Sequence, residues 1–363
     1  MAKKNLEGLY GVLKRRRHRY DTDEVAKLIS KVDEERVTAL AKSLGSYISK
    51  NLPTAISKRK GLPDYRTNPY VLLTSANVMG LSDPAAFGSF LFNNKLYAGL
   101  ETSFGKSIEA AFVGHYPIVA DVQGKWVDAP EKLAEFAALE GLSNEEKARK
   151  RVGSVWREID KSCVSGERRF LTSIKSGPNC INDTQVSGMV DAIAKHHKAW
   201  LRESKKTYPA VKELDVVIGL TYGTDATTNN KENQILTKLQ EHGFKEEDRE
   251  LKPGILINEE ETVRIYRRIG QDFWSFIGNP SDSASASFVF LEVLLALSKA
   301  LSTGIKDASL GDRVNLKLLQ LSDALRSMMF PRSNLPKWIE EDFGETELFW
   351  LATALTAFYD EGI

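Results

Sequence analysis

The chain has little cysteine and almost no net charge. Among its 363 residues, Cys163 and Cys180 are the two thiols, and 50 Lys and Arg side chains nearly balance 49 Asp and Glu, for a net charge of +1. Two thiols alone make neither a disulfide framework nor a zinc site, so we expect a reducing, cytoplasmic location. The balanced charge excludes a general attraction to polyanions, and any nucleic-acid surface must come from local clusters.

Long hydrophobic runs are also scarce. The N-terminal stretch MAKKNLEGLYGVLKRRRHRY lacks the apolar core of a signal peptide. The most apolar stretch, residues 287–302, contains Glu292 and Lys299. This stretch predicts a buried helix, too short and too charged to span a bilayer, so we expect no membrane partner.

Residues 1–100 are predicted to be helical. An apolar stripe from Val37 to Ile48 indicates a helix that Asp33 would cap and Pro53 would end. Three further helix starts are predicted, at Asn68-Pro69, at Asp83-Pro84 and, for a helix through about Phe112, at Thr102.

Strand patterns appear after residue 150. Residues 154–161 and 168–175, separated by Ser165-Gly166, predict a hairpin, and residues 215–220 predict an apolar strand covered on both faces. Residues 262–277 mix strand and helix signals. Helices are predicted at 181–203, 229–242, 285–303, 312–328 and 345–360. The pattern predicts an α/β fold, with a mixed β-sheet core flanked by helices, a helical N-terminal region and a helical C-terminal segment.

Chemistry is expected at the ends of the predicted hairpin strands. Leu171, Ser173 and Lys175 share one strand face, and Asp160 ends the neighbouring strand 12 residues before Ser173. An aspartate at one strand end, with an acid-x-lysine on the next, can hold magnesium beside a phosphodiester. The lysine would orient or deprotonate the attacking water.

The turn after Lys175 carries a resemblance. Ile174–Asn182, IKSGPNCIN, resembles a turn of type II restriction endonucleases in the PD-(D/E)XK nuclease superfamily. Phe104–Glu109 resembles the Gly-Lys-x-x-Glu helix that precedes the core in many of these enzymes, and Gly270–Gly278 resembles a Gly-x-x-Phe-Trp segment that follows it. The resemblance implies Mg²⁺-dependent, sequence-specific cleavage of double-stranded DNA by a homodimer, with a cognate DNA methyltransferase as system partner.

One position departs from that family. Ser173 stands where Glu or Asp is usual, and serine binds magnesium only weakly or through water. Glu109 is the first candidate for the missing acid, because the resembling helix donates a glutamate, and Glu158 is the second. Asp160 and Glu109 are thus the expected metal ligands, beside the catalytic Lys175.

DNA contacts are expected from the polar groups after the lysine. The candidates are Ser176, Asn179, Asn182 and Gln185, which could bind phosphate oxygens or base edges. The basic runs 14–19 and 58–60 are plausible contacts to the DNA backbone. Adjacent His196 and His197 point in different directions on a helix, so they do not predict a zinc site.

The expected organisation is a helical DNA-contacting or dimerisation region at 1–100, a catalytic core at 101–290 and a helical segment at 291–363 that packs on the core. Two other functions stay open. Ser173 suggests a catalytically silent DNA-binding protein on a decayed nuclease core, and a repair nuclease without sequence specificity is also compatible with the motifs. The recognition sequence and cut position are not encoded in these patterns.

Overall fold

The computed structural model describes residues 27–57, 62–65, 68–119, 124–177, 181–223, 231–250, 254–258, 262–304, 308–326 and 336–355. The chain forms two compact units, each assembled from separate segments. The sheet unit comprises residues 1–43 and 108–299, and the helical unit comprises residues 44–107 and 300–363. The units are therefore discontinuous in sequence, whereas the predicted regions are three consecutive segments.

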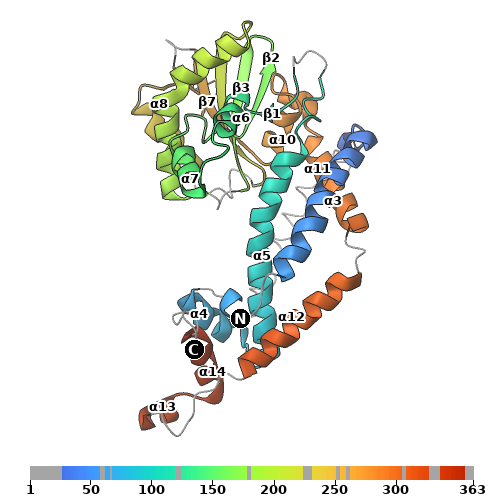
Figure 1. Cartoon of the computed structure of the whole chain (residues 1–363). Coiled ribbons are helices and arrows are strands. Elements are labelled where there is room, and N and C mark those ends of the chain that lie inside the picture. Colours follow the sequence, from blue (N-terminus) through green and yellow to red (C-terminus); the bar gives the residue numbers. More distant parts are fainter. Residues whose placement is uncertain are drawn as a thin grey trace, which may run out of the picture. The chain divides into compact units, whose positions relative to one another are not determined.

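The sheet unit is built on a mixed sheet of seven strands (Figure 1) in the order β1-β2-β3-β4-β7-β6-β5. Its strands are β1 (Val127–Asp128), β2 (Lys161–Ser165), β3 (Arg168–Lys175), β4 (Glu213–Leu220), β5 (Lys245–Glu246), β6 (Leu256–Asn258) and β7 (Val263–Ile269). β3, β4 and β7 run parallel at the centre, and the outer pairs are antiparallel. This architecture confirms the predicted α/β core.

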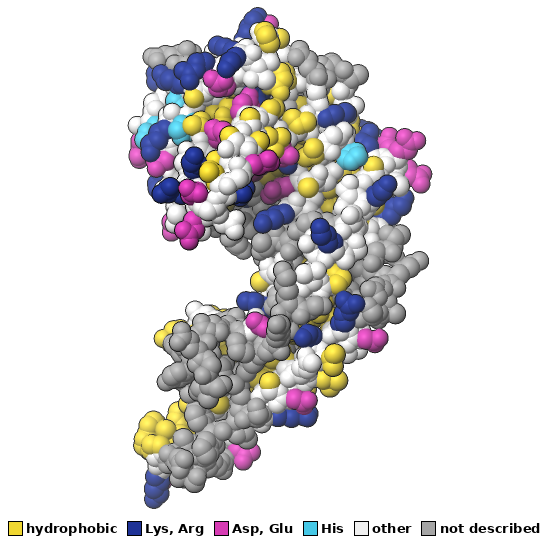
Figure 2. Space-filling view, in the orientation of Figure 1, with side chains coloured by type: hydrophobic (Ala, Val, Ile, Leu, Met, Phe, Trp, Pro, Cys, Tyr) yellow, Lys and Arg dark blue, Asp and Glu magenta, His cyan; other side chains and the backbone are white. Residues whose placement is uncertain are grey.

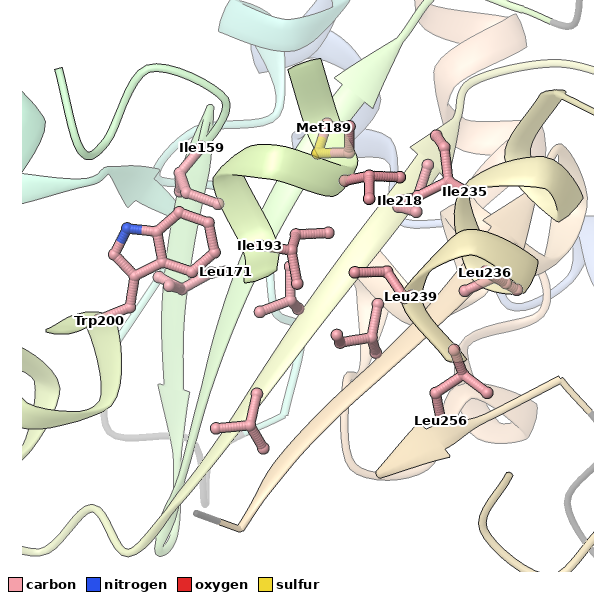
Figure 3. Packing of buried hydrophobic residues seen from close by; sticks show 14 of the residues in the cluster. Ile159, Leu171, Met189, Ile193, Trp200, Ile218, Ile235, Leu236, Leu239 and Leu256 are labelled. Atoms are coloured by element: carbon pink, nitrogen blue, oxygen red, sulfur yellow. The ribbon is translucent and has the colours of Figure 1, made fainter. Parts of the chain in front are cut away.

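Helices α8 (Asp183–Thr207) and α9 (Lys231–Gln240) cover one face of the sheet. Ile193 of α8 and Leu239 of α9 are fully buried and point at strand residues such as Ile218 (Figure 3). β4 is buried along nearly its whole length, as expected for a central parallel strand. Burial of this cluster is the main force that fixes the strands that carry the candidate site.

Helix α10 (Gln271–Gly278) lies against the other face, and Phe276 packs on Phe170 of β3. Phe273 and Trp274 are buried, as predicted for core residues. Gly270, just before the helix, has φ +57°, and a Cβ there would lie 2.3 Å from the carbonyl oxygen of Gly223. This close approach between two backbone segments explains physically why the segment begins with glycine.

The remaining helices are distributed over both units. They are α3 (Glu34–Ser57), α4 (Pro69–Met79), α5 (Pro84–Ala111), α6 (Pro130–Ala137), α7 (Asn144–Val152), α11 (Val289–Gly304), α12 (Ala308–Arg326), α13 (Lys337–Asp342) and α14 (Glu345–Leu355), with short 3₁₀ turns at Leu62–Tyr65 and Ser283–Ala286. The predicted caps at Asp33, Asn68 and Asp83 are confirmed. Asp33, Asn68 and Asp83 each accept hydrogen bonds from backbone N–H groups in the first helical turn.

Three predicted boundaries are wrong. Residues 154–161 form a turn because the Ser154 hydroxyl accepts from the N–H of Trp156, and β2 begins only at Lys161. α3 continues through Pro53 to Ser57, since packing of the buried Ile56 holds its last turn. Thr102 lies inside the single long helix α5 and starts no helix of its own.

The helical unit has its own apolar core. Phe87 of α5 packs edge-to-face on Phe349 of α14, with ring centroids 5.4 Å apart, and both are buried. The indole N–H of Trp350 donates to the carbonyl oxygen of Leu81 at 2.7 Å. These contacts tie the segments before and after the sheet unit into one compact body.

One helical stretch, Ser283–Ala300, has the length and apolar composition of a membrane span among the described residues, so the expectation that it is too short fails. A core helix passes the same test, and here Glu292 is fully buried within protein. Its carboxylate accepts from the guanidinium of Arg36 at 2.8 Å and from the hydroxyl of Tyr116 at 2.5 Å. These contacts favour a helix buried in the sheet unit.

Candidate active site

The candidate site lies where β3 ends. The register pairs Lys175 with Leu220 of β4, and Leu220 with Ile269 of β7, so the three parallel strands end at the same edge of the sheet. Ligands of open α/β sheets commonly bind at such carboxyl ends. The β3 bounds are those predicted from the sequence, and they place Lys175 as the last strand residue.

Asp160 lies directly before β2, next to the end of β3. Its N–H donates to the carbonyl oxygen of Thr172 at 2.8 Å, and its Oδ2 accepts from the N–H of Ile174 at 2.7 Å. Lys161 pairs with Thr172, so the next position of the register sets Asp160 opposite Ser173. The backbone of β3 therefore fixes the carboxylate of Asp160 through Oδ2, and its Oδ1 lies 3.5 Å from the ammonium of Lys132.

Lys175 is mostly buried, and its ammonium lies 3.9 Å from the carboxylate of Glu158. Glu158 belongs to the turn before β2. The prediction that it shares a strand face with Asp160 is therefore wrong. The contact nevertheless keeps an acid beside the lysine. Such a pair can hold Lys175 in place and partly compensate its charge.

Glu109 reaches the same region from the last turns of α5. Partial burial and the negative charge of Asp160 raise the pKa of Glu109 to about 7, while Lys161, Lys175 and Lys132 act in the opposite direction. Within the described part of the chain, Glu109 forms no hydrogen bond or ion pair. A carboxyl with these neighbours is available for a ligand.

Ser173 is fully buried, and its hydroxyl has no hydrogen-bond partner among the described residues. It thus has neither the charge nor the exposure of a metal ligand. A buried hydroxyl without a partner is costly, and such groups often mark positions shaped by function.

The turn after Lys175 is held against the loop that follows β4. The N–H of Thr221 donates to the carbonyl oxygen of Lys175 at 3.0 Å, and its hydroxyl donates to that of Ser176 at 2.6 Å. A Cβ at Gly177 would lie 2.2 Å from the ring of Tyr222. The Ser-Gly step of the motif therefore has a packing role at the sheet edge.

The predicted DNA-contacting residues differ in their local structural roles, and some lie outside the described residues. Asn182 and Gln185 form a reciprocal capping box at the start of α8, each accepting from the other's backbone N–H at 2.9 Å. This local role accounts for both residues without DNA, although both stay exposed. Asn179 and the basic runs 14–19 and 58–60 lie outside the described residues.

The donor set suits a magnesium ion in part. Among the described residues no group of three or more His, Cys, Asp or Glu side chains is placed to hold a metal. Mg²⁺, however, is commonly bound by one or two carboxylates together with water and substrate phosphates. Asp160 and Glu109 supply two such groups. Burial and then repulsion by Asp160 raise the pKa of Glu109, and a cation would relieve the repulsion.

The segment with this geometry has known relatives. Residues 137–295 match the family of type II restriction endonuclease EcoO109I. No curated protein matches the chain. The restriction-endonuclease match supports the resemblance drawn from the motifs and indicates a nuclease. It contains Asp160, Ser173 and Lys175, whereas Glu109 precedes it.

Sequence reasoning missed two lysines of this region. Lys132 of α6 lies 3.5 Å from Asp160, and Lys161 pairs with Asp128 at 2.5 Å. Neither belongs to a motif, because a lysine at a helix start or a strand start is ordinary. On the face drawn in Figure 2, acidic and basic side chains are interspersed over the sheet unit, which agrees with the balanced composition.

Proposed function

We propose that the chain is a type II restriction endonuclease that hydrolyses phosphodiester bonds of double-stranded DNA at a specific sequence, with Mg²⁺ as cofactor. The observation that carries the proposal is the meeting of Asp160, Lys175 and Glu109 at one sheet edge, within electrostatic range of one another. Two of the three belong to the segment that matches the restriction-endonuclease family.

Each residue has a distinct proposed task. Asp160, whose carboxylate is held by the backbone of β3, would bind the cation, and Glu109 would add the second carboxylate. Mg²⁺, when bound, would neutralise charge on the scissile phosphate and make hydroxide available. Lys175 orients the attacking water or takes its proton, and its ammonium steadies the developing negative charge.

The partners follow from this reaction. We propose a homodimer, because one site per subunit cuts one strand and two-fold symmetry matches a palindromic sequence. A cognate DNA methyltransferase would protect the host's own sites. Val71 and Val78 of α4 are exposed apolar side chains that a second copy could contact.

A catalytically silent DNA-binding protein remains the second candidate. It is favoured by Ser173, which is buried and uncharged at the position where the family carries an acid. The two candidates differ in whether Glu109 replaces that acid.

A plasmid digest with Mg²⁺ tests the proposal. Discrete fragments are expected from the wild-type protein, and Asp160→Asn should abolish them, because an amide lacks the anionic oxygen that a hard cation prefers. Retained specific binding without cleavage would favour the silent protein. A smear of products would show a nuclease without sequence specificity.

A further inference from the structure

Lys132 makes three contacts with one short segment of the chain. It lies in the first turn of α6, and its ammonium donates to the carbonyl oxygens of Ile159 at 2.6 Å and Arg157 at 3.1 Å. The third neighbour is Oδ1 of Asp160 at 3.5 Å. All three acceptors belong to the irregular segment that leads into β2, which we call the Asp160 loop (residues 153–160).

The Asp160 loop needs such support. It has no regular secondary structure, so its carbonyl groups find no partners in a helix or sheet ladder. Its first part is held by the indole N–H of Trp200, which donates to Val155 at 3.0 Å, and by burial of Trp156 and Ile159. Lys132 holds the last part, where the carboxylate of Asp160 is presented.

The polar contacts of Lys132 are directed to the Asp160 loop. The two carbonyl oxygens take two of the three donors of its ammonium group, and the carboxylate of Asp160 adds an ion pair at 3.5 Å. Lys175, in contrast, has a longer contact of 3.9 Å to Glu158 and sits at the strand end.

We propose that Lys132 is a positioning residue for the nuclease site. It fixes the Asp160 loop and with it the carboxylate of Asp160 at the sheet edge, and it acts through Asp160 without touching the substrate. This inference rests on the proposed function. It adds a residue that lies outside the segment matched by the restriction-endonuclease family.

Lys161 is the matched control. It follows Asp160 directly and, like Lys132, its charge lowers the pKa of Glu109. Its ammonium is bound to Asp128 across the β1–β2 pair and makes no contact with the Asp160 loop. Lys161→Met removes a charge near the site, whereas Lys132→Met removes a charge together with the support of the loop.

The first measurement is hydrogen exchange of the metal-free, DNA-free protein. Lys132→Met should speed exchange of the Asp160 and Ile174 amides by about tenfold or more, because the two hydrogen bonds between Asp160 and β3 open more often. Lys161→Met should change these amides by less than about threefold, and Lys132→Arg should fall between the two, since it restores the charge but not the compact three-donor geometry.

The second measurement is calorimetric titration with Mg²⁺ alone. Lys132→Met should weaken Mg²⁺ binding by about tenfold or more, the range seen when a supporting contact of a metal ligand is lost, and Lys161→Met by much less. Equal exchange and equal affinity in Lys132→Met and wild type would overturn the inference. Equal losses in both lysine variants would also overturn it, because the effect would then not be specific to the support of the Asp160 loop.

The two proposals fail separately. Hydrogen exchange needs neither metal nor DNA, so it tests the role of Lys132 even if the wild-type protein cleaves nothing. Far-ultraviolet circular dichroism of each variant shows whether the fold is retained. If Lys132→Met does not fold, Lys132→Arg carries the test, with faster exchange of the Ile174 amide than in Lys161→Met as the expected result.

Discussion

Replacement of Glu109 by Gln should stabilise the metal-free protein at alkaline pH. The amide keeps the shape of the protonated acid but removes the charge that burial and Asp160 disfavour. Because the folded-state pKa lies above the ordinary value of 4.5, the folded protein holds this proton more tightly than the unfolded chain. Stability of the wild type therefore falls as the pH rises from about 4.5 to about 7, and the penalty is complete above that range.

The size of the effect follows from the shift. A change from 4.5 to about 7 corresponds at most to about 3.4 kcal/mol, at about 1.36 kcal/mol per unit. Glu109 is only partly buried, and solvent screening reduces this ceiling to about 1–2 kcal/mol. At about pH 8, Glu109→Gln should thus unfold at a higher urea concentration than the wild type, and near about pH 4.5 the two should nearly coincide.

Urea denaturation in the presence of a chelator, followed at both pH values, measures this difference. Glu158→Gln is the matched control, and it should lose up to about 1 kcal/mol at about pH 8 because its contact with Lys175 is removed. A Glu109→Gln variant that is less stable than the wild type at that pH would refute the reasoning. So would a stability difference that does not change with pH.

Three further substitutions test the candidate site and the backbone geometry near it. Lys175→Ala should abolish cleavage and leave specific DNA binding largely intact in a gel-shift assay. Cleavage at a near wild-type rate would contradict the catalytic role of Lys175. Ser173→Ala should stabilise the protein by up to about 1 kcal/mol in urea denaturation, since it removes a buried hydroxyl without a partner among the described residues. The same variant should lose far less cleavage activity than Glu109→Gln. A large loss of activity would make the serine a functional ligand. Gly270→Ala should cost about 3 kcal/mol or more, because its Cβ would meet the carbonyl oxygen of Gly223 at a positive φ, and an unchanged melting temperature would contradict this geometry.

Parts of the fold that depend on local signals could be predicted from the sequence. β3 has the predicted bounds because a turn at Gly166-Glu167 precedes it and Gly177 follows it. The caps at Asn68 and Asp83 were predictable since a side chain oxygen before proline satisfies free N–H groups locally. In each of these cases the determining contacts lie within a few residues.

Parts that depend on tertiary packing could not be predicted. The alternation of Trp156 with polar neighbours imitates a strand, but Trp156 and Ile159 are buried by packing of the Asp160 loop on the core. α5 runs past Thr102 without interruption, since packing outweighs its glycines and its β-branched residues. Lys132 could not be found for the same reason, because its three acceptors lie more than twenty positions further along the chain.

The placement of the second carboxylate follows from the same packing. The side chain of residue 173 is fully buried on the central strand β3, so a charged group there would lose its hydration. Glu109 approaches from a helix and keeps partial exposure, so it can lose its proton once a cation is present. An acid on α5 thus supplies charge next to Asp160 at a lower desolvation cost than an acid at position 173. In the proposed site, Ser173 in β3 and Glu109 in α5 therefore belong together. Moving the acid from residue 109 to residue 173 should destabilise the sheet and should not restore a metal site.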